Sequence, residues 1–97
     1  MDINKALKTA VTTGKVVFGF EQTVKALTAG SAKLVITSSN CPDEHLAQVH
    51  KYKDVATHRF SGNNIELGSA CGKPFAVSML SVLNEGDSEI LALGKSK

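Results

Sequence analysis

Apolar residues repeat every three or four positions near the N-terminus. These positions are Ile3, Ala6, Leu7, Ala10 and Val11. The spacing places them on one side of a helix. Asp2 is a favourable N-cap residue, and Gly14 is a favourable residue at a helix end. The pattern therefore predicts a helix between these two residues.

Beyond this helix, short apolar runs are separated by polar turns and further helical patterns. We expect strands at residues 15–18, 32–38, 55–60 and 75–83, and helices at residues 20–30, 42–53 and 65–71. Residues 89–93 are expected to be helical or extended. The run 75–83 is the longest apolar segment, which predicts a strand buried on both faces.

The alternation of strands with short helices predicts an α/β fold, a three-layer α/β/α sandwich. A chain of 97 residues without internal repeats or linkers is expected to form a single domain over residues 1–97. Its apolar runs are too short for a membrane span, and its N-terminus lacks the apolar core of a signal peptide. We therefore expect a cytoplasmic protein with no membrane contact.

The charge is nearly balanced, with 11 Lys and Arg against 9 Asp and Glu, a net charge of +2. Residues 1–40 carry a balance of +3, and residues 41–97 a balance of −1. This distribution excludes a polybasic tail. A nucleic-acid partner would therefore be recognised by its shape and by specific contacts more than by bulk charge.

Three polar loops are candidates for a binding site, at residues 19–23, 39–42 and 71–75. The first two each lead from a strand into a helix N-terminus, where unpaired N–H groups favour phosphates or base acceptors. If the strands lie side by side, the loops converge. The simpler interpretation, that Gly19 and Asn40 only serve turns and caps, remains open at this point.

Two side chains in these loops carry the most specific chemistry. The amide of Asn40 can both donate and accept hydrogen bonds. Phe75 follows Pro74 after a polar turn, and an aromatic ring there could stack on an unpaired base. A core phenylalanine at the start of a buried strand is an equally good interpretation of Phe75.

The cysteines suggest an alternative from another class of function. Cys41 precedes Pro42 at a helix start, so a thiol-dependent or redox enzyme is one alternative, with His45 one turn away as a possible base. Cys41 and Cys71 are expected to be free thiols. A small domain that binds an anionic metabolite at the helix ends is a third hypothesis. The His and Cys spacings match no common zinc pattern, so we expect no metal and no cofactor.

Several segments resemble, in the same order, ribosomal proteins of the L-thirty-e family, within the L-seven-Ae superfamily of RNA-binding proteins. The segments are Gly14-Lys15-Val16-Val17-Phe18-Gly19, Gly30-Ser31-Ala32-Lys33-Leu34-Val35-Ile36, Ser39-Asn40-Cys41-Pro42, Glu66-Leu67-Gly68-Ser69-Ala70-Cys71-Gly72-Lys73-Pro74-Phe75 and Glu85-Gly86-Asp87-Ser88-Glu89-Ile90-Leu91. Together they span nearly the whole chain. The short N-terminus resembles the archaeal members.

The resemblance implies an α/β/α sandwich around a four-stranded mixed sheet. It also implies a structural component of the large ribosomal subunit, not an enzyme, that binds kink-turn ribosomal RNA. The expected partners are that RNA and other large-subunit components, on the ribosome in the cytoplasm. The free protein is expected to be a monomer without cofactors.

By the same resemblance, the first loop packs against tandem sheared G·A pairs, Asn40 bonds to a base, and Phe75 contacts bulged bases with Val77 beside it. The full set of expected RNA-binding residues is Gly19, Phe20, Glu21, Gln22, Thr23, Asn40, Pro42, Lys73, Phe75 and Val77. Glu21 departs from the family pattern, because many relatives have a lysine there. A carboxylate can accept hydrogen bonds from guanine N1–H and N2–H₂, but it also repels phosphates.

Overall fold

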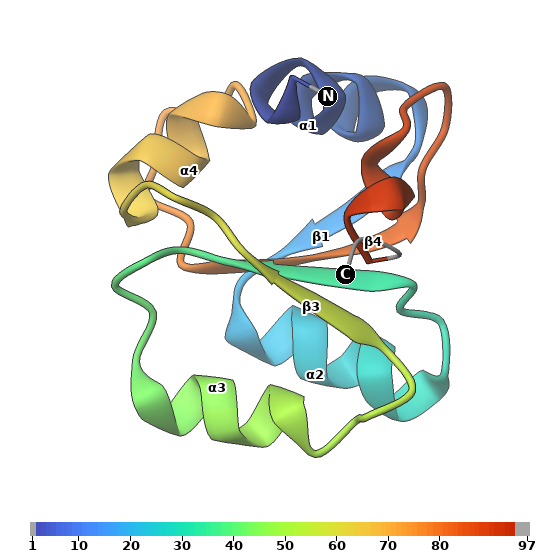
Figure 1. Cartoon of the computed structure of the whole chain (residues 1–97), viewed down its shortest axis with the longest axis vertical. Coiled ribbons are helices and arrows are strands. Elements are labelled where there is room, and N and C mark those ends of the chain that lie inside the picture. The colour runs from blue at the N-terminus through green and yellow to red at the C-terminus, as the bar shows by residue number, and fades with distance from the viewer. Residues whose placement is uncertain (1, 95–97) are drawn as a thin grey trace.

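A computed structural model describes residues 2–94, which form an α/β/α sandwich (Figure 1). The helices are α1 (Ile3–Thr13), α2 (Phe20–Ala29), α3 (Asp43–His50), α4 (Asn64–Ala70) and the short 3-10 helix η1 (Ile90–Gly94). The strands are β1 (Lys15–Phe18), β2 (Leu34–Thr37), β3 (Ala56–Arg59) and β4 (Met79–Asn84). The predicted fold class is confirmed.

The four strands form one mixed sheet in the order β1-β4-β2-β3. β4 pairs antiparallel with both β1 and β2, whereas β2 and β3 are parallel. Phe18 lies opposite Leu80 and Thr37 opposite Met79. The carboxyl ends of β1, β2 and β3 therefore lie at the same end of the sheet, together with the start of β4.

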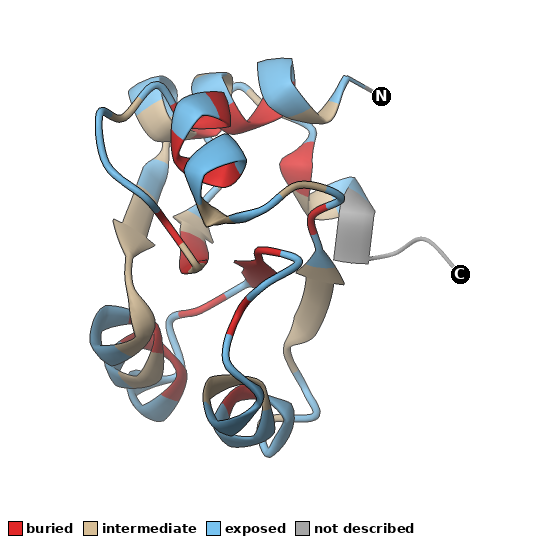
Figure 2. Cartoon of the chain, turned by 90° about the vertical axis from the view of Figure 1, so that its left-hand side faces the viewer, coloured by how far each residue is buried: buried red, intermediate tan, exposed pale blue. Residues whose placement is uncertain are grey.

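Helices cover both faces of this sheet (Figure 1). On one face, α1, α4 and η1 bury an apolar cluster that includes Leu7, Leu67 and Ile90. On the other face, α2 and α3 bury a second cluster that includes Leu27 and Val49. Figure 2 shows the buried parts of these helices turned inward. Because side chains alternate along a strand, successive β2 residues supply opposite clusters.

Local sequence signals explain where the helices begin and end. Asp2 accepts a hydrogen bond from the backbone N of Lys5 at 3.2 Å, as its N-cap position predicts. Asn63 caps α4 and forms a reciprocal capping box with Glu66. Gly30 ends α2 with φ of 76°, a left-handed conformation that glycine adopts without strain.

One predicted element is wrong at its start. The expected strand 75–83 begins only at Met79, and the residues before it leave the sheet. The reason is α4: Val77 donates its backbone N–H to the Asn64 carbonyl at 2.9 Å, and the Phe75 carbonyl lies against Gly68. The predicted burial of the strand is confirmed for its first four residues. The third helix ends at His50, three residues earlier than expected.

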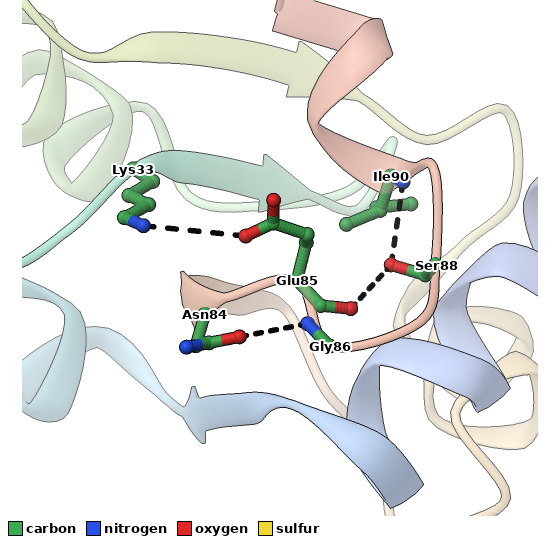
Figure 3. Close-up of polar contacts among 6 residues, drawn as sticks. All are labelled: Lys33, Asn84, Glu85, Gly86, Ser88 and Ile90. Atoms are coloured by element: carbon green, nitrogen blue, oxygen red, sulfur yellow. Dashed lines mark hydrogen bonds and ion pairs between the residues drawn. The ribbon is translucent and has the colours of Figure 1, made fainter.

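The turn after β4 is tied to the end of β4 and the start of β2 (Figure 3). Asn84 accepts from the Gly86 N–H at 2.8 Å, and the Ser88 hydroxyl donates to the Glu85 carbonyl at 2.7 Å. Glu85 also lies 4.0 Å from the Lys33 ammonium, a partly exposed pair of small energetic value. These bonds lead the chain into η1, in the segment expected to be helical or extended.

No helix among residues 2–94 is both long and apolar enough to cross a bilayer.

Candidate nucleic-acid interface

The loops singled out in the sequence meet at one end of the sheet. The Gly19 N–H donates to the Met79 carbonyl at 2.8 Å, and the Ser38 N–H donates to the Ser78 carbonyl at 2.9 Å. The start of β4 therefore holds the loop after β1 and the loop after β2. We call residues 18–22, 39–42 and 73–75 the loop cluster.

The first part of the loop cluster is the N-terminus of α2. Gly19 is its N-cap, with φ of 95°, and no side chain in the described part of the protein caps this helix. A Cβ at Gly19 would meet nothing within 4 Å, so the backbone conformation rather than space favours glycine here. The first N–H groups of α2 remain available to an acceptor outside the protein.

A surface hollow of about 400 Å³ adjoins this helix end. Its lining consists of Phe18, Gly19, Phe20, Glu21, Gln22 and His45. The His45 ring, from α3, stacks on Phe20 with 3.9 Å between the ring centroids and 10° between the planes. The hollow thus combines aromatic faces with the exposed side chains of Glu21 and Gln22.

Asn40, in the second part, is bonded to α4. Its Oδ1 accepts from the Ser38 hydroxyl at 2.9 Å and from the Asn64 backbone N–H at 2.9 Å. Its Nδ2 donates to Asn64 Oδ1 at 3.2 Å. Asn40 is nevertheless exposed, so a ligand can reach what these bonds leave free.

The third part is an aromatic and cationic group after α4. Phe75 is 52% exposed. Its ring packs in a T-shaped arrangement against the Phe18 ring, with 6.4 Å between the ring centroids and 88° between the ring planes. The Lys73 ammonium lies 5.2 Å from the centroid of the Phe18 ring, within cation–π range. Because Phe75 is exposed outside the sheet, its interpretation as a core residue at the start of a strand is wrong.

The expected site residues divide by exposure. Exposed at the loop cluster are Glu21, Gln22, Asn40, Pro42 and Phe75, and partly exposed are Gly19, Phe20 and Lys73. Thr23 is 0% exposed and Val77 is 3% exposed. The expectation that these two residues contact RNA does not fit their burial. Val77 instead packs beneath the Phe75 loop, in the cluster shared with Leu67.

Three residues at or beside the loop cluster were not in the expected set. They are Asn64, Arg59 and His45. The Arg59 guanidinium donates to the Ser39 carbonyl at 2.8 Å, and this contact follows from the parallel pairing of β3 with β2. From the sequence, Asn64 was predicted only to lie just before the helix expected at residues 65–71. Its bond to Asn40, 24 residues away, had no signal in the sequence.

The two cysteines are buried, free thiols in surroundings that disfavour the thiolate. Burial, and secondarily the Asp43 carboxylate, raise the pKa of Cys41. Burial raises the pKa of Cys71 to about 11, although Lys73 partly opposes this. A nucleophilic cysteine needs a lowered pKa and access to solvent, so these properties weigh against a thiol enzyme. The described residues also contain no group of three potential metal ligands.

The sequence matches the family described as "Ribosomal protein L7Ae/L30e/S12e/Gadd45 family" over residues 1–92. The chain belongs to this family. The resemblance seen in the sequence motifs is thereby confirmed.

Individual relatives agree over nearly their whole length. The "Large ribosomal subunit protein eL30" of Methanospirillum hungatei is 43% identical over 98% of this chain and 100% of its own. The protein of the same name from Methanoregula boonei is 40% identical over 99% of both chains. That from Methanocaldococcus jannaschii is 41% identical over 100% of this chain and 91% of its own.

Among solved structures, a protein of unknown function from Bacillus halodurans has a similar fold. The TM-score is 0.79 with 29% sequence identity, over 98% of each chain. The two proteins thus share the α/β/α sandwich over nearly the whole length of both chains.

Proposed function

We propose that this protein is a structural component of the large ribosomal subunit that binds kink-turn ribosomal RNA through the loop cluster. One observation carries the proposal: the uncapped N-terminus of α2, the Asn40 amide and the exposed Phe75 ring lie at the same end of the sheet. Relatives named as large-subunit proteins support the ribosomal part. The proposed role is binding, without catalysis or a cofactor, alongside other large-subunit components.

The chemistry of the loop cluster fits an RNA with a sharp kink. Specific recognition of RNA favours bulges and unstacked bases, read by hydrogen bonds and aromatic stacking. The N–H groups of α2 and the side chains of Glu21 and Gln22 suit base edges, and Phe75 suits the face of a bulged base. Lys73 and Arg59 supply positive charge for the two phosphate backbones that a kink brings together.

The proposal is tested by comparing two RNAs in a gel-shift titration. One contains a kink-turn, and the other has its tandem G·A pairs replaced by Watson–Crick pairs. We expect clear preference for the kink-turn, with a single protein per RNA. Equal affinity for both would contradict the proposal. A thermal shift caused by phosphate or nucleotides, with none from RNA, would favour the metabolite-binding hypothesis instead.

Replacement of Asn40 by alanine tests the central contact. We expect Asn40→Ala to weaken kink-turn binding by about 1–3 kcal/mol, because the base edge facing Asn40 would be buried at the interface without its hydrogen-bond partner. Asn4→Ala, an exposed asparagine on α1, is the matched control and should bind as the wild type does. Thermal unfolding of both variants separates lost contacts from lost structure. An Asn40→Ala variant with full affinity would remove Asn40 from the interface.

A further inference from the structure

The helices α2 and α3 run in the same direction on one face of the sheet (Figure 1). Both begin at the loop cluster, and both end at the opposite end of the sheet, where β2 and β3 start. α2 has 10 residues, so at 1.5 Å per residue its length is about 15 Å. The line between the two helices therefore leads away from the loop cluster along the outside of the protein.

Two surface hollows follow this line beyond the hollow of the loop cluster. The nearer one, of about 410 Å³, shares Phe20 and Glu21 with the loop cluster and extends to Lys25 of α2 and Gln48 of α3. Gln48 Oε1 accepts from the Lys51 ammonium at 3.2 Å. Lys51 in turn lines the farther hollow, of about 450 Å³, at the C-terminal ends of both helices. We call the two hollows together the α2–α3 groove.

Positive charge exceeds negative charge along the α2–α3 groove beyond Glu21. Lys25, Lys51 and Lys53 line it and are exposed, and Asp54 is the acid beside them. Within residues 2–94, none of these three lysines forms an ion pair. An ammonium group that no carboxylate neutralises is available to a phosphate, because binding then replaces only loosely held counterions.

Hollows on the other face of the sheet have a different charge. One beside α1 is lined by the three acids Asp2, Asp87 and Glu89 and by a single base, Lys5. Another, between α1 and α4, balances one lysine with one glutamate. A polyanion is attracted to a surface of surplus positive charge and repelled by the acidic one. The charge distribution thus favours the α2–α3 groove as the path of RNA beyond the loop cluster.

We infer that the α2–α3 groove binds the phosphate backbone of an RNA stem that continues from the kink, with Lys51 and Lys53 at the phosphates farthest from the loop cluster. The inference rests on the proposed function and extends it to a second surface of the protein. A duplex carries one phosphate per strand for roughly every 3 Å of its axis, so a groove of this length spans several phosphates. The backbone contacts would fix the direction of the stem without reading its sequence.

The first experiment compares two charge-matched double variants. Lys51→Gln with Lys53→Gln removes the far cations of the groove, and Lys5→Gln with Lys8→Gln removes two exposed cations of α1 on the other face. Each is titrated at low salt with a minimal kink-turn RNA and with RNAs in which one stem or the other is lengthened. We expect lengthening of one stem to tighten wild-type binding about tenfold, and the groove variant alone to lose this gain.

The dependence on salt gives a second measure from the same proteins. With the longer RNA, the slope of the logarithm of affinity against the logarithm of salt concentration should be smaller by about 1.5 for the groove variant than for the α1 variant. Equal losses in the two variants, equal losses with short and long RNA, or no gain from either stem would overturn the inference. Failure of the wild type to prefer the kink-turn would overturn the proposed function instead. Thermal unfolding shows whether each variant is folded.

A tethered cleavage reagent locates the stem directly. Lys53→Cys adds an exposed thiol, whereas Cys41 and Cys71 are buried, so an iron chelate reacts selectively at position 53. We expect hydroxyl radicals from this site to cut the lengthened stem away from the kink. Lys8→Cys carrying the same chelate is the control and should leave that stem intact. Equal cleavage patterns from the two positions, or no cleavage of the stem from position 53, would contradict the inferred path.

Discussion

Single polar residues at the loop cluster are already held by hydrogen bonds within the protein. Asn40 is the main case, because most of its hydrogen-bonding capacity is already used by Ser38 and Asn64. Such preorganisation lowers the entropy lost on binding. The sequence could predict that Asn40 is a polar residue at the end of a strand, since the motif and the apolar run before it were visible. It could not predict the bond to Asn64, which depends on where α4 docks.

Burial of Cys71 makes stability depend on alkaline pH. The raised pKa, about 11 against an ordinary 9.0, means that the native thiol keeps its proton while the unfolded thiol releases it. The free energy of unfolding should therefore fall between pH 9 and 11, by about 1–2 kcal/mol for this group. Urea unfolding at pH 8 and pH 10.5 measures the fall. Cys71→Ala should show a smaller fall, and an equal one would contradict the assignment.

At the scale of elements, α4 determines where the Phe75 loop lies. A Cβ at Gly68 would come 2.0 Å from the Phe75 carbonyl oxygen, which belongs to the backbone and cannot turn away. We expect Gly68→Ala to push the loop from the helix, lower stability by about 1–3 kcal/mol and weaken RNA binding. Chemical denaturation and gel shifts measure both effects. Ser69→Ala, an exposed neighbour, is the control, and equal behaviour of the two variants would refute this packing.

The start of α4 depends on its capping box. In Asn63→Ala the Glu66 N–H loses its acceptor, and we expect a loss of about 1 kcal/mol in the free energy of unfolding. Asn63→Asp should retain most of that stability because a carboxylate oxygen takes the same place. Equilibrium unfolding of the wild type and the two variants measures these free energies. An Asn63→Ala variant as stable as the wild type would show that the cap does not contribute to stability.

Elements with caps were the most predictable from sequence. The helix between Asp2 and Gly14 appeared where its apolar face and end signals put it. The strand expected from Phe75 was wrong at its first four residues, because an apolar run has the same appearance whether it enters a sheet or packs along a helix. The contacts that distinguish the two cases, the Val77 to Asn64 hydrogen bond and the packing of the Phe75 carbonyl against Gly68, are tertiary contacts.

For the whole molecule, the near-balanced charge predicts a shallow response to salt. The net charge is +2, and few bases lie at or beside the loop cluster: Lys73, Arg59, and Lys25, which lines a hollow together with Phe20 and Glu21. We expect the affinity for a kink-turn RNA to fall with salt as for about 2–4 phosphate contacts. Titrations from low to moderate potassium chloride give this slope. A steep dependence typical of polybasic proteins would place the RNA on a different surface.

The position of β4 has a consequence for how the chain folds during its synthesis. β4 is the last strand in sequence but lies between β1 and β2 in the sheet. Until residue 84 has left the exit tunnel, β1 has no neighbouring strand, and only the β2–β3 pair can form. Pairing of distant segments is slow, and unpaired strand edges invite aggregation. We therefore expect the sheet of a nascent chain to be completed late, with open strand edges until β4 arrives.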